Sequence, residues 1–246
     1  MLFTTFVFMK NLSLALRYLV FSLLLTPFFL RSQIVSSNST VTDIEGQVYK
    51  TVKIGKQVWM AENLKTSKYR DGSKIPQVID AKSWEHANTG AWSHVQNDEK
   101  FNAVYGKLYN WYAVNDKKGL CPVGWAVPSD DDWKILESVY KMSDNDLDEL
   151  EWRGTNQAIF LKDKGSTHWR ENNSMSTNAS GLSVLPAGSK RTLGQFFGLY
   201  SLAYLWAATE ESQGSGWFRC IQDTKLNICR EGIDKHFGLS VRCIQK

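Results

Sequence analysis

Two cysteine-containing segments constrain the fold of this chain more than any other feature of its sequence. Cys121 opens the segment CPVGWAVPSDDDW, and Cys243 lies three residues before the C-terminus in GLSVRCIQK. If these two cysteines pair, one covalent bond encloses the C-terminal half of the chain in a single loop. The sequence therefore predicts one module that a disulfide ties together, provided that the protein is exported.

The N-terminal segment has the pattern of a signal peptide. Lys10 and Arg17 precede a short apolar run at residues 18–30, and polar residues follow. A retained anchor is the weaker alternative, because a membrane span that takes in Arg17 would cost about 2.5 kcal/mol or more near the bilayer centre. We predict that residues 1–32 are a signal peptide cleaved near Ser32. The protein is then secreted, periplasmic or at the cell surface, without a stable membrane span after cleavage.

The remaining chain carries little net charge. The full sequence has a formal net charge of +4, and the predicted signal peptide holds three basic residues and no acids, which leaves +1. No cluster of Lys and Arg remains that could neutralise a row of phosphates, so we expect no nucleic-acid partner. Residues 33–42 are rich in Ser and Asn and predict a disordered lead-in, and residues 43–246 have the size of one domain.

The order of the predicted elements is strands, then helices, then strands. Two sets of side chains alternate along residues 48–54, as in a β-strand. Gly55 and Lys56 interrupt this strand pattern, and residues 57–60 resume it, which predicts a β-hairpin. Residues 66–100 are mostly loop, apart from a short helix expected around residues 81–87. Two further helices are expected, one after Ser129 and one near residues 154–161. The predicted fold class is therefore α+β.

The clearest helix signal begins at Ser129. This residue is a candidate N-cap, three aspartates at 130–132 fill the first turn, and large apolar residues recur from Trp133 at helical spacing. Carboxylates near the positive end of a helix dipole are favourable there. A metal site is the alternative interpretation of the aspartates, and the cap explains every residue more simply.

The other two cysteines fit a hairpin. We expect a C-terminal meander of residues 217–222, 226–230 and 239–244, in which a turn at Thr224 and Lys225 sets Cys220 opposite Cys229. The favoured connectivity among the three open to four cysteines is therefore Cys121–Cys243 with Cys220–Cys229. Metal binding by the four cysteines is the alternative, but no CxxC pair is present.

Several segments together resemble a known family. They are DIEGQVYKTVKIGKQVWMAENL from Asp43, YGKLYNWYAV from Tyr105, CPVGWAVPSDDDW from Cys121, GLSVLPAG from Gly181, LWAATE from Leu205 and GLSVRCIQK from Gly238. In this order they resemble the Fibrobacter succinogenes major paralogous domain family. Ala126 departs from the family pattern, which usually has His there. The resemblance implies export and a C-type-lectin-like single domain with a small antiparallel sheet, two helices, long loops and a disulfide. It also implies similarity to the formylglycine-generating-enzyme branch, but no ligand.

A lectin-type calcium site is not expected. Such a site needs Glu-Pro-Asn or Gln-Pro-Asp together with Trp-Asn-Asp, and the sequence contains neither. Asn172, Asn173 and Asn178 could supply oxygens from one loop, although asparagines of this kind usually belong to turns. We therefore predict no metal and no cofactor.

No complete catalytic constellation is present either. Cys220 and Cys229 are the only pair that could serve a formylglycine-generating activity, which would require reactive thiolates. The four histidines are scattered outside known motifs, and the acidic residues between 144 and 151 suit a solvated helix face. We expect no catalytic residues and no enzyme.

Aromatic residues remain as candidates for binding. Six of the ten tryptophans lie in apolar segments and suit the core, whereas four have polar neighbours and are candidates for stacking on a ligand: Trp84, Trp92, Trp152 and Trp169. The favoured function is an exported, non-catalytic binding or adhesion module for a polysaccharide or a surface protein. The alternatives are an enzyme or degenerate enzyme of the formylglycine-generating type and a structural component of a surface assembly.

Overall fold

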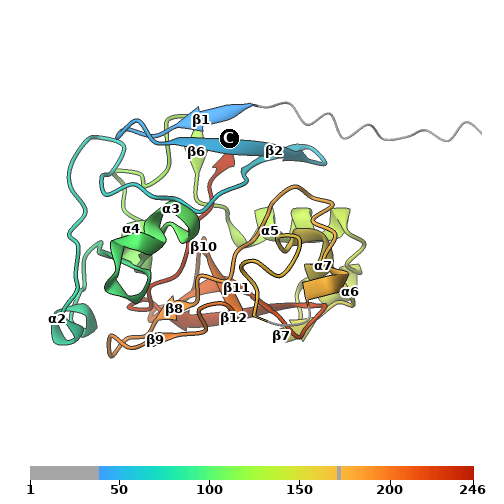
Figure 1. Cartoon of the computed structure of the whole chain (residues 1–246). Helices are drawn as coiled ribbons and strands as arrows, with labels where there is room; N and C mark the ends of the chain where they lie inside the picture. Colours follow the sequence, from blue (N-terminus) through green and yellow to red (C-terminus); the bar gives the residue numbers. More distant parts are fainter. Residues whose placement is uncertain (1–38, 171–172) are drawn as a thin grey trace, which may run out of the picture. The chain divides into compact units, whose positions relative to one another are not determined.

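A computed structural model describes residues 39–170 and 173–246 of the chain (Figure 1). The predicted signal peptide at residues 1–32 lies outside the described residues. Residues 40–42 of the predicted lead-in form a strand, so the expectation of disorder is wrong there. None of the helices in the described part of the chain is long and apolar enough to cross a membrane.

Antiparallel strand pairs dominate the structure. One sheet has the order β1-β2-β3-β13-β6 and is built from Thr40–Thr42, Val48–Ile54, Gln57–Met60, Ile244–Gln245 and Trp125–Ala126. The second has the order β10-β11-β12-β7, formed by Leu202–Ser212, Ser215–Gln222, Ile228–Asp234 and Glu151–Arg153. Two small hairpins are β4-β5, Trp92–His94 with Lys107–Tyr109, and β8-β9, Ser189–Lys190 with Phe196–Phe197.

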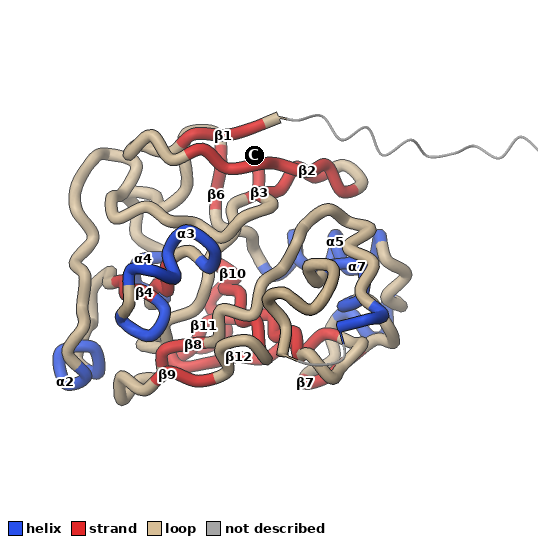
Figure 2. The backbone as a smooth tube through the Cα atoms, viewed as in Figure 1, coloured by secondary structure: helices blue, strands red, loops and turns tan. Residues whose placement is uncertain are grey.

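Helices are short and loops are long (Figure 2). The two predicted helices are present as α5, Asp130–Val139, and α7, Ala158–Leu161. The short helix expected near residue 81 is α2, Ala81–Glu85. Additional single turns are α3, Asn102–Tyr105, α4, Trp111–Val114, and α6, Asp144–Leu147, with 3₁₀ turns at η2, Val95–Asn97, η3, Glu99–Phe101, and η4, Asn173–Met175. The α+β class with antiparallel sheets is confirmed, although the described residues contain more helices than the two of the expected fold and the short one near residue 81.

The predicted hairpin at residues 48–60 is confirmed as β2-β3, with Ile54 opposite Gln57. The predicted third strand of the C-terminal meander is wrong. Residues 239–244 leave the β11-β12 pair, and Ile244 instead lies between Trp59 of β3 and Ala126 of β6. The apolar pattern of this segment marks it as buried, but its own residues do not specify which distant strand it pairs with.

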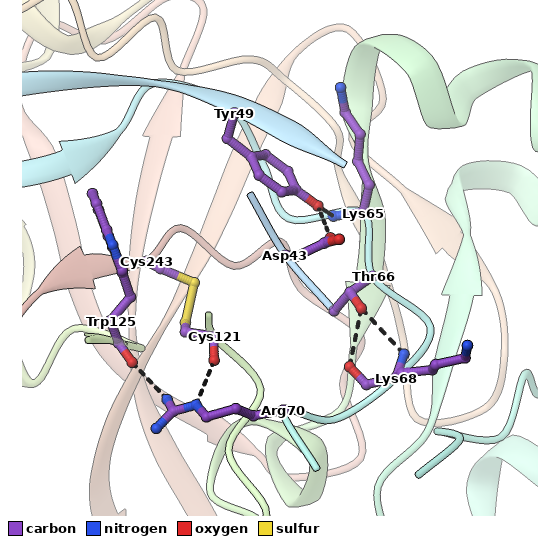
Figure 3. Close-up of a disulfide and its surroundings, with 9 residues drawn as sticks. All are labelled: Asp43, Tyr49, Lys65, Thr66, Lys68, Arg70, Cys121, Trp125 and Cys243. Atoms are coloured by element: carbon purple, nitrogen blue, oxygen red, sulfur yellow. Dashed lines mark hydrogen bonds between the residues drawn. A yellow bond between two sulfur atoms is a disulfide. The ribbon is translucent and has the colours of Figure 1, made fainter. Parts of the chain in front are cut away.

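The disulfide between Cys121 and Cys243 is confirmed. The two Cα atoms are 6.0 Å apart, 122 residues separate them in the sequence, and both residues are buried. Arg70 binds the same region, because its guanidinium donates to the carbonyl oxygens of Cys121 at 2.9 Å and Trp125 at 2.7 Å (Figure 3). The disulfide therefore joins the residue just before β13 to the loop that leads into β6.

Helix α5 begins as the sequence predicts. The Ser129 hydroxyl accepts from the backbone N–H of Asp132, and the Asp132 carboxylate accepts from the backbone N–H of Ser129 at 2.7 Å. This capping box satisfies donors that the first turn would otherwise leave unpaired. The helix lies against one face of the four-stranded sheet.

A buried ion cluster fixes α5 to that sheet. Asp130 binds Arg219 at 2.7 Å and Arg230 at 2.8 Å, while Glu137 binds Arg219 at 2.6 Å and Arg153 at 2.8 Å. Burial by itself would raise the pKa of Asp130, but the hydrogen bonds and charges of the two arginines outweigh it, so that the pKa is lowered. Removal of one partner from such a cluster leaves a buried charge unpaired, which is strongly destabilising.

The four-stranded sheet separates two groups of buried apolar residues. Leu205, Ile221 and Ile228 belong to the group around α5, whereas Tyr204, Phe218 and Cys229 belong to the group on the other face. Successive side chains of a strand point to opposite faces, which explains the split. The second face carries the candidate site.

The disulfide should contribute substantially to stability. We expect the double variant Cys121→Ala/Cys243→Ala to lose roughly 4 to 5 kcal/mol of unfolding free energy, because the bond closes a long loop in the unfolded chain. Urea unfolding followed by tryptophan fluorescence measures the loss. The matched control is Cys220→Ala/Cys229→Ala, which removes two buried thiols and no cross-link. An equal loss in both variants would show that packing, and not the cross-link, is responsible.

Candidate functional site: an aromatic cleft

A cleft of about 530 Å³ opens on the face of the four-stranded sheet opposite to α5. We call it the aromatic cleft. Its lining residues come from the sheet, from the β8-β9 hairpin and from the loop before β13: Trp152, Ser189, Arg191, Phe197, Leu202, Tyr204, Phe218, Cys220, Gln222, Cys229, Glu231, Ile233 and Phe237. Its volume lies in the range usual for ligand pockets, about 300–1,000 Å³.

One row of side chains crosses all four strands at the floor of the cleft. Tyr204 of β10 lies opposite Cys220 of β11, Cys220 lies opposite Cys229 of β12, and Cys229 lies opposite Trp152 of β7. Directly paired residues of neighbouring strands point to the same face. The floor is therefore a pair of thiols between two aromatic rings.

The β8-β9 hairpin forms a wall of the cleft. The Arg191 guanidinium lies 4.4 Å from the centre of the Phe197 ring, and the Phe197 side chain is 46% exposed. Gly188, with φ 68°, allows the backbone of Phe197 to lie close to the residue before β8. A Cβ atom at Gly188 would lie 2.4 Å from the carbonyl oxygen of Phe197. An accessible phenyl ring and a cation thus stand at the entrance.

Cys220 and Cys229 lie directly opposite each other, as predicted, but the predicted bond between them is not formed. Both are free thiols and both are buried. The Cys229 thiol donates to the Glu231 carboxylate at 3.4 Å. A hydrogen bond with Cys220, burial and the charge of Glu231 all raise the pKa of Cys229. A thiol with a raised pKa is a weak nucleophile at neutral pH.

Three of the four tryptophans predicted to stack on a ligand are in the core, and the prediction of an exposed surface is wrong for them. The exposed fractions are 0% for Trp84, 6% for Trp92 and 1% for Trp169. Polar sequence neighbours do not indicate exposure here, because loops of the chain cover the three rings. Large aromatic rings are buried wherever the fold can cover them.

Each of these rings already has a cation over its face. The ammonium groups of Lys190, Lys107 and Lys162 lie 4.3 Å, 4.6 Å and 5.4 Å from the ring centres of Trp84, Trp92 and Trp169, respectively. Backbone carbonyl oxygens bind the same ammonium groups, as when Lys190 donates to Val78 at 2.8 Å. The indole faces are therefore occupied by the protein itself.

Trp152 is the predicted tryptophan that remains accessible. It is half-buried, lines the aromatic cleft, and has the Lys225 ammonium 5.0 Å from its ring centre. Sequence reasoning missed the other cleft residues. The alternation of residues around Cys220 and Cys229 indicates Phe218 and Glu231 as members of the same face, whereas no local pattern indicates Arg191 or Phe197.

The asparagines considered as an alternative source of calcium ligands make hydrogen bonds within their own loops where they are described, as expected of turn residues. The Asn173 amide donates to the carbonyl oxygens of Asp163 and Gly165, both at 2.6 Å, and the Asn178 amide donates to Ser183 at 2.7 Å. Asn172 lies outside the described residues. Among residues 39–170 and 173–246, no three His, Cys, Asp or Glu side chains are grouped so as to hold a metal ion.

The fold and the site define an α+β domain with antiparallel sheets, one disulfide and an aromatic cleft. The chain belongs to the Fibrobacter succinogenes major domain family, whose model matches residues 52–245. This match includes the whole β10-β11-β12-β7 sheet, which lines the aromatic cleft, and both cysteines of the disulfide. Neither the curated proteins nor the solved structures that were compared gave a match.

Lys190 should make stability depend on pH. Burial lowers the pKa of Lys190 from 10.5 to about 8, so the unfolded chain binds more protons between these values. Lys190 should therefore make a contribution to the unfolding free energy that rises with pH across this window, by up to about 3 kcal/mol. In urea titrations at pH 7.5 to 10.5, Lys190→Met should lack this contribution, whereas the exposed control Lys164→Met should keep it. An unchanged pH dependence in Lys190→Met would contradict the assignment.

The state of the second cysteine pair can be tested directly. The structure predicts that a maleimide added to the unfolded, unreduced protein labels Cys220 and Cys229 and leaves Cys121 and Cys243 unlabelled. Peptide mapping by mass spectrometry identifies the sites, and the native protein should react slowly because both thiols are 3% exposed. Complete absence of label would instead establish the second disulfide.

Proposed function

We propose that the protein is an exported, non-catalytic binding module, and that its aromatic cleft holds an apolar segment of a surface protein. The observation that carries this proposal is the cleft itself, with an accessible Phe197 beside Arg191 at its entrance. Phenylalanine and arginine are both enriched in the buried centres of protein interfaces.

Binding is favoured over catalysis by the state of the cleft thiols. A formylglycine-generating activity needs a reactive thiolate, but the pKa of Cys229 is raised and its thiol is buried. The described histidines do not line the cleft, so no imidazole stands ready there to take the proton. These features support a binding role.

A protein partner is favoured over a polysaccharide by the chemistry of the walls. Phe197, Phe218 and Phe237 have no polar group, and Leu202 and Ile233 extend the same apolar surface. Sugar rings require several hydrogen bonds at the sides of an aromatic platform, whereas an apolar peptide side chain requires mainly area. Arg191 and Glu231 can bind the charged or backbone groups that flank such a side chain.

The fold itself is proposed to be C-type-lectin-like. This proposal rests on the sequence resemblance and on the way in which β1 and β13, from the two ends of the domain, belong to one sheet. Long loops between short strands and the disulfide agree with it. A lectin-like scaffold often uses surface features to bind partners, but the fold does not determine the ligand.

A second candidate function is that of an enzyme or degenerate enzyme of the formylglycine-generating type. The specific observation in its favour is the free pair Cys220 and Cys229 at the floor of the cleft. The maleimide experiment above bears on it, because an unlabelled, oxidised pair would leave no thiol for that chemistry.

The cleft assignment can be tested with displayed random peptides and a glycan array. We expect saturable binding to apolar peptides, weakened about tenfold or more by Phe197→Ala and by Arg191→Ala, which corresponds to at least about 1.4 kcal/mol. Leu193→Ala is the matched control, since Leu193 is a 56% exposed apolar residue of the same hairpin outside the cleft. Its affinity should be unchanged.

Three outcomes would count against the proposal. Peptide binding that survives both cleft variants would place the binding surface elsewhere. Saturable binding to glycans alone, with the same sensitivity to Phe197→Ala, would make the cleft a sugar site. Absence of binding to both panels would remove the support for a binding module.

A further inference from the structure

A second pocket, of about 400 Å³, lies in the loop region between β3 and β5. We call it the polar pocket. The residues that matter for its chemistry are Gln77, Trp92, His94, Glu99, Asn102 and Lys107. It shares no lining residue with the aromatic cleft. Any ligand that it holds is therefore recognised by different groups.

The β4-β5 hairpin builds the pocket. Trp92 and His94 belong to β4, and Lys107 of β5 lies directly opposite His94. A parallel bridge between Gln77 and Trp92 brings the preceding loop alongside β4, while η3 and α3 contribute Glu99 and Asn102. Four separate segments thus present polar side chains to one cavity.

Two of these side chains carry polar atoms that the described protein leaves unpaired. His94 Nδ1 and the Asn102 side-chain oxygen are buried and have no hydrogen-bond partner among the described residues. His94 is 92% buried, at 8% exposure, and packs edge-on against Trp92 with ring centres 5.0 Å apart. Buried polar groups normally have a partner, so these two indicate a missing one.

The side chains that line the pocket carry one charge of each sign, apart from His94. Lys107 supplies one positive charge, and its ammonium also donates to the carbonyl oxygen of Lys65. Glu99 supplies one exposed negative charge. Burial and the charge of Lys107 lower the pKa of His94, so that the imidazole is uncharged at neutral pH. The pocket therefore offers no excess charge for an anion or a cation.

We propose that the polar pocket binds a neutral, hydroxyl-rich ligand of the size of one sugar residue. A hydroxyl group both donates and accepts, so one ring with several hydroxyls can pair with the carboxylate of Glu99, the amides of Gln77 and Asn102 and the imidazole of His94.

Neutral methyl glycosides are the probes for the test, with glucuronate and glucosamine as charged comparisons. Saturation-transfer NMR with the full chain should detect saturable binding of at least one neutral glycoside. Gln77→Ala and Glu99→Ala each remove an exposed side chain and should each weaken that binding about tenfold, the loss of roughly one hydrogen bond to a polar or charged group.

Matched controls are available on other surfaces. Gln213→Ala and Glu149→Ala remove an exposed amide and an exposed carboxylate outside the pocket and should leave affinity unchanged. Phe197→Ala should also leave it unchanged, which separates this proposal from that for the aromatic cleft. Failure of every neutral glycoside to bind, a preference for either charged probe, or binding that is insensitive to both pocket variants would overturn the proposal.

Discussion

The buried ion cluster around Asp130 is the interaction on which the rest of the structure depends. It fixes helix α5 to three strands at once, because Arg219 comes from β11, Arg230 from β12 and Arg153 from β7. Buried charges need well-oriented partners to offset the cost of their removal from water, so the geometry of this cluster leaves little freedom for the helix. With one face of the four-stranded sheet covered in this way, the opposite face alone is left to form a cleft.

The covering of the second face differs in kind. It is only partly closed, by the β8-β9 hairpin, whose Phe197 and Arg191 side chains remain accessible. The floor of this face contains thiols in place of a continuous apolar layer. A sheet that is closed by a helix on one side and open on the other presents a rigid floor to a ligand. The strands that hold the ion cluster are the same strands that position the floor, so stability and the candidate site share one element.

Three buried lysines explain how tryptophans with polar sequence neighbours come to be buried beneath long loops. The ammonium groups of Lys107, Lys162 and Lys190 each lie over an indole ring. Each also donates a hydrogen bond to a backbone carbonyl oxygen of a loop. Burial of a lysine is costly unless its donors are satisfied. The loops provide these acceptors, and the lysines in turn hold the loops over the rings. Lys107 lines the polar pocket, and Lys190 directly precedes Arg191 of the aromatic cleft.

Local sequence patterns determined the features that depend on neighbouring residues. The capping box at Ser129, the hairpin at residues 48–60 and the register of Cys220 against Cys229 follow from neighbouring residues, and the family follows from several segments of the sequence. The sequence also predicts the Cys121–Cys243 bond, but together with a Cys220–Cys229 bond that is not formed. Tertiary structure alone decided which strands accept the C-terminal segment, which tryptophans are buried and which residues line each pocket. The reason is physical: capping and alternation act over a few residues, whereas burial of Trp84 by Lys190 requires segments about a hundred residues apart to pack together. The approach of Arg191 to the cleft likewise requires the β8-β9 hairpin to pack against a separate sheet.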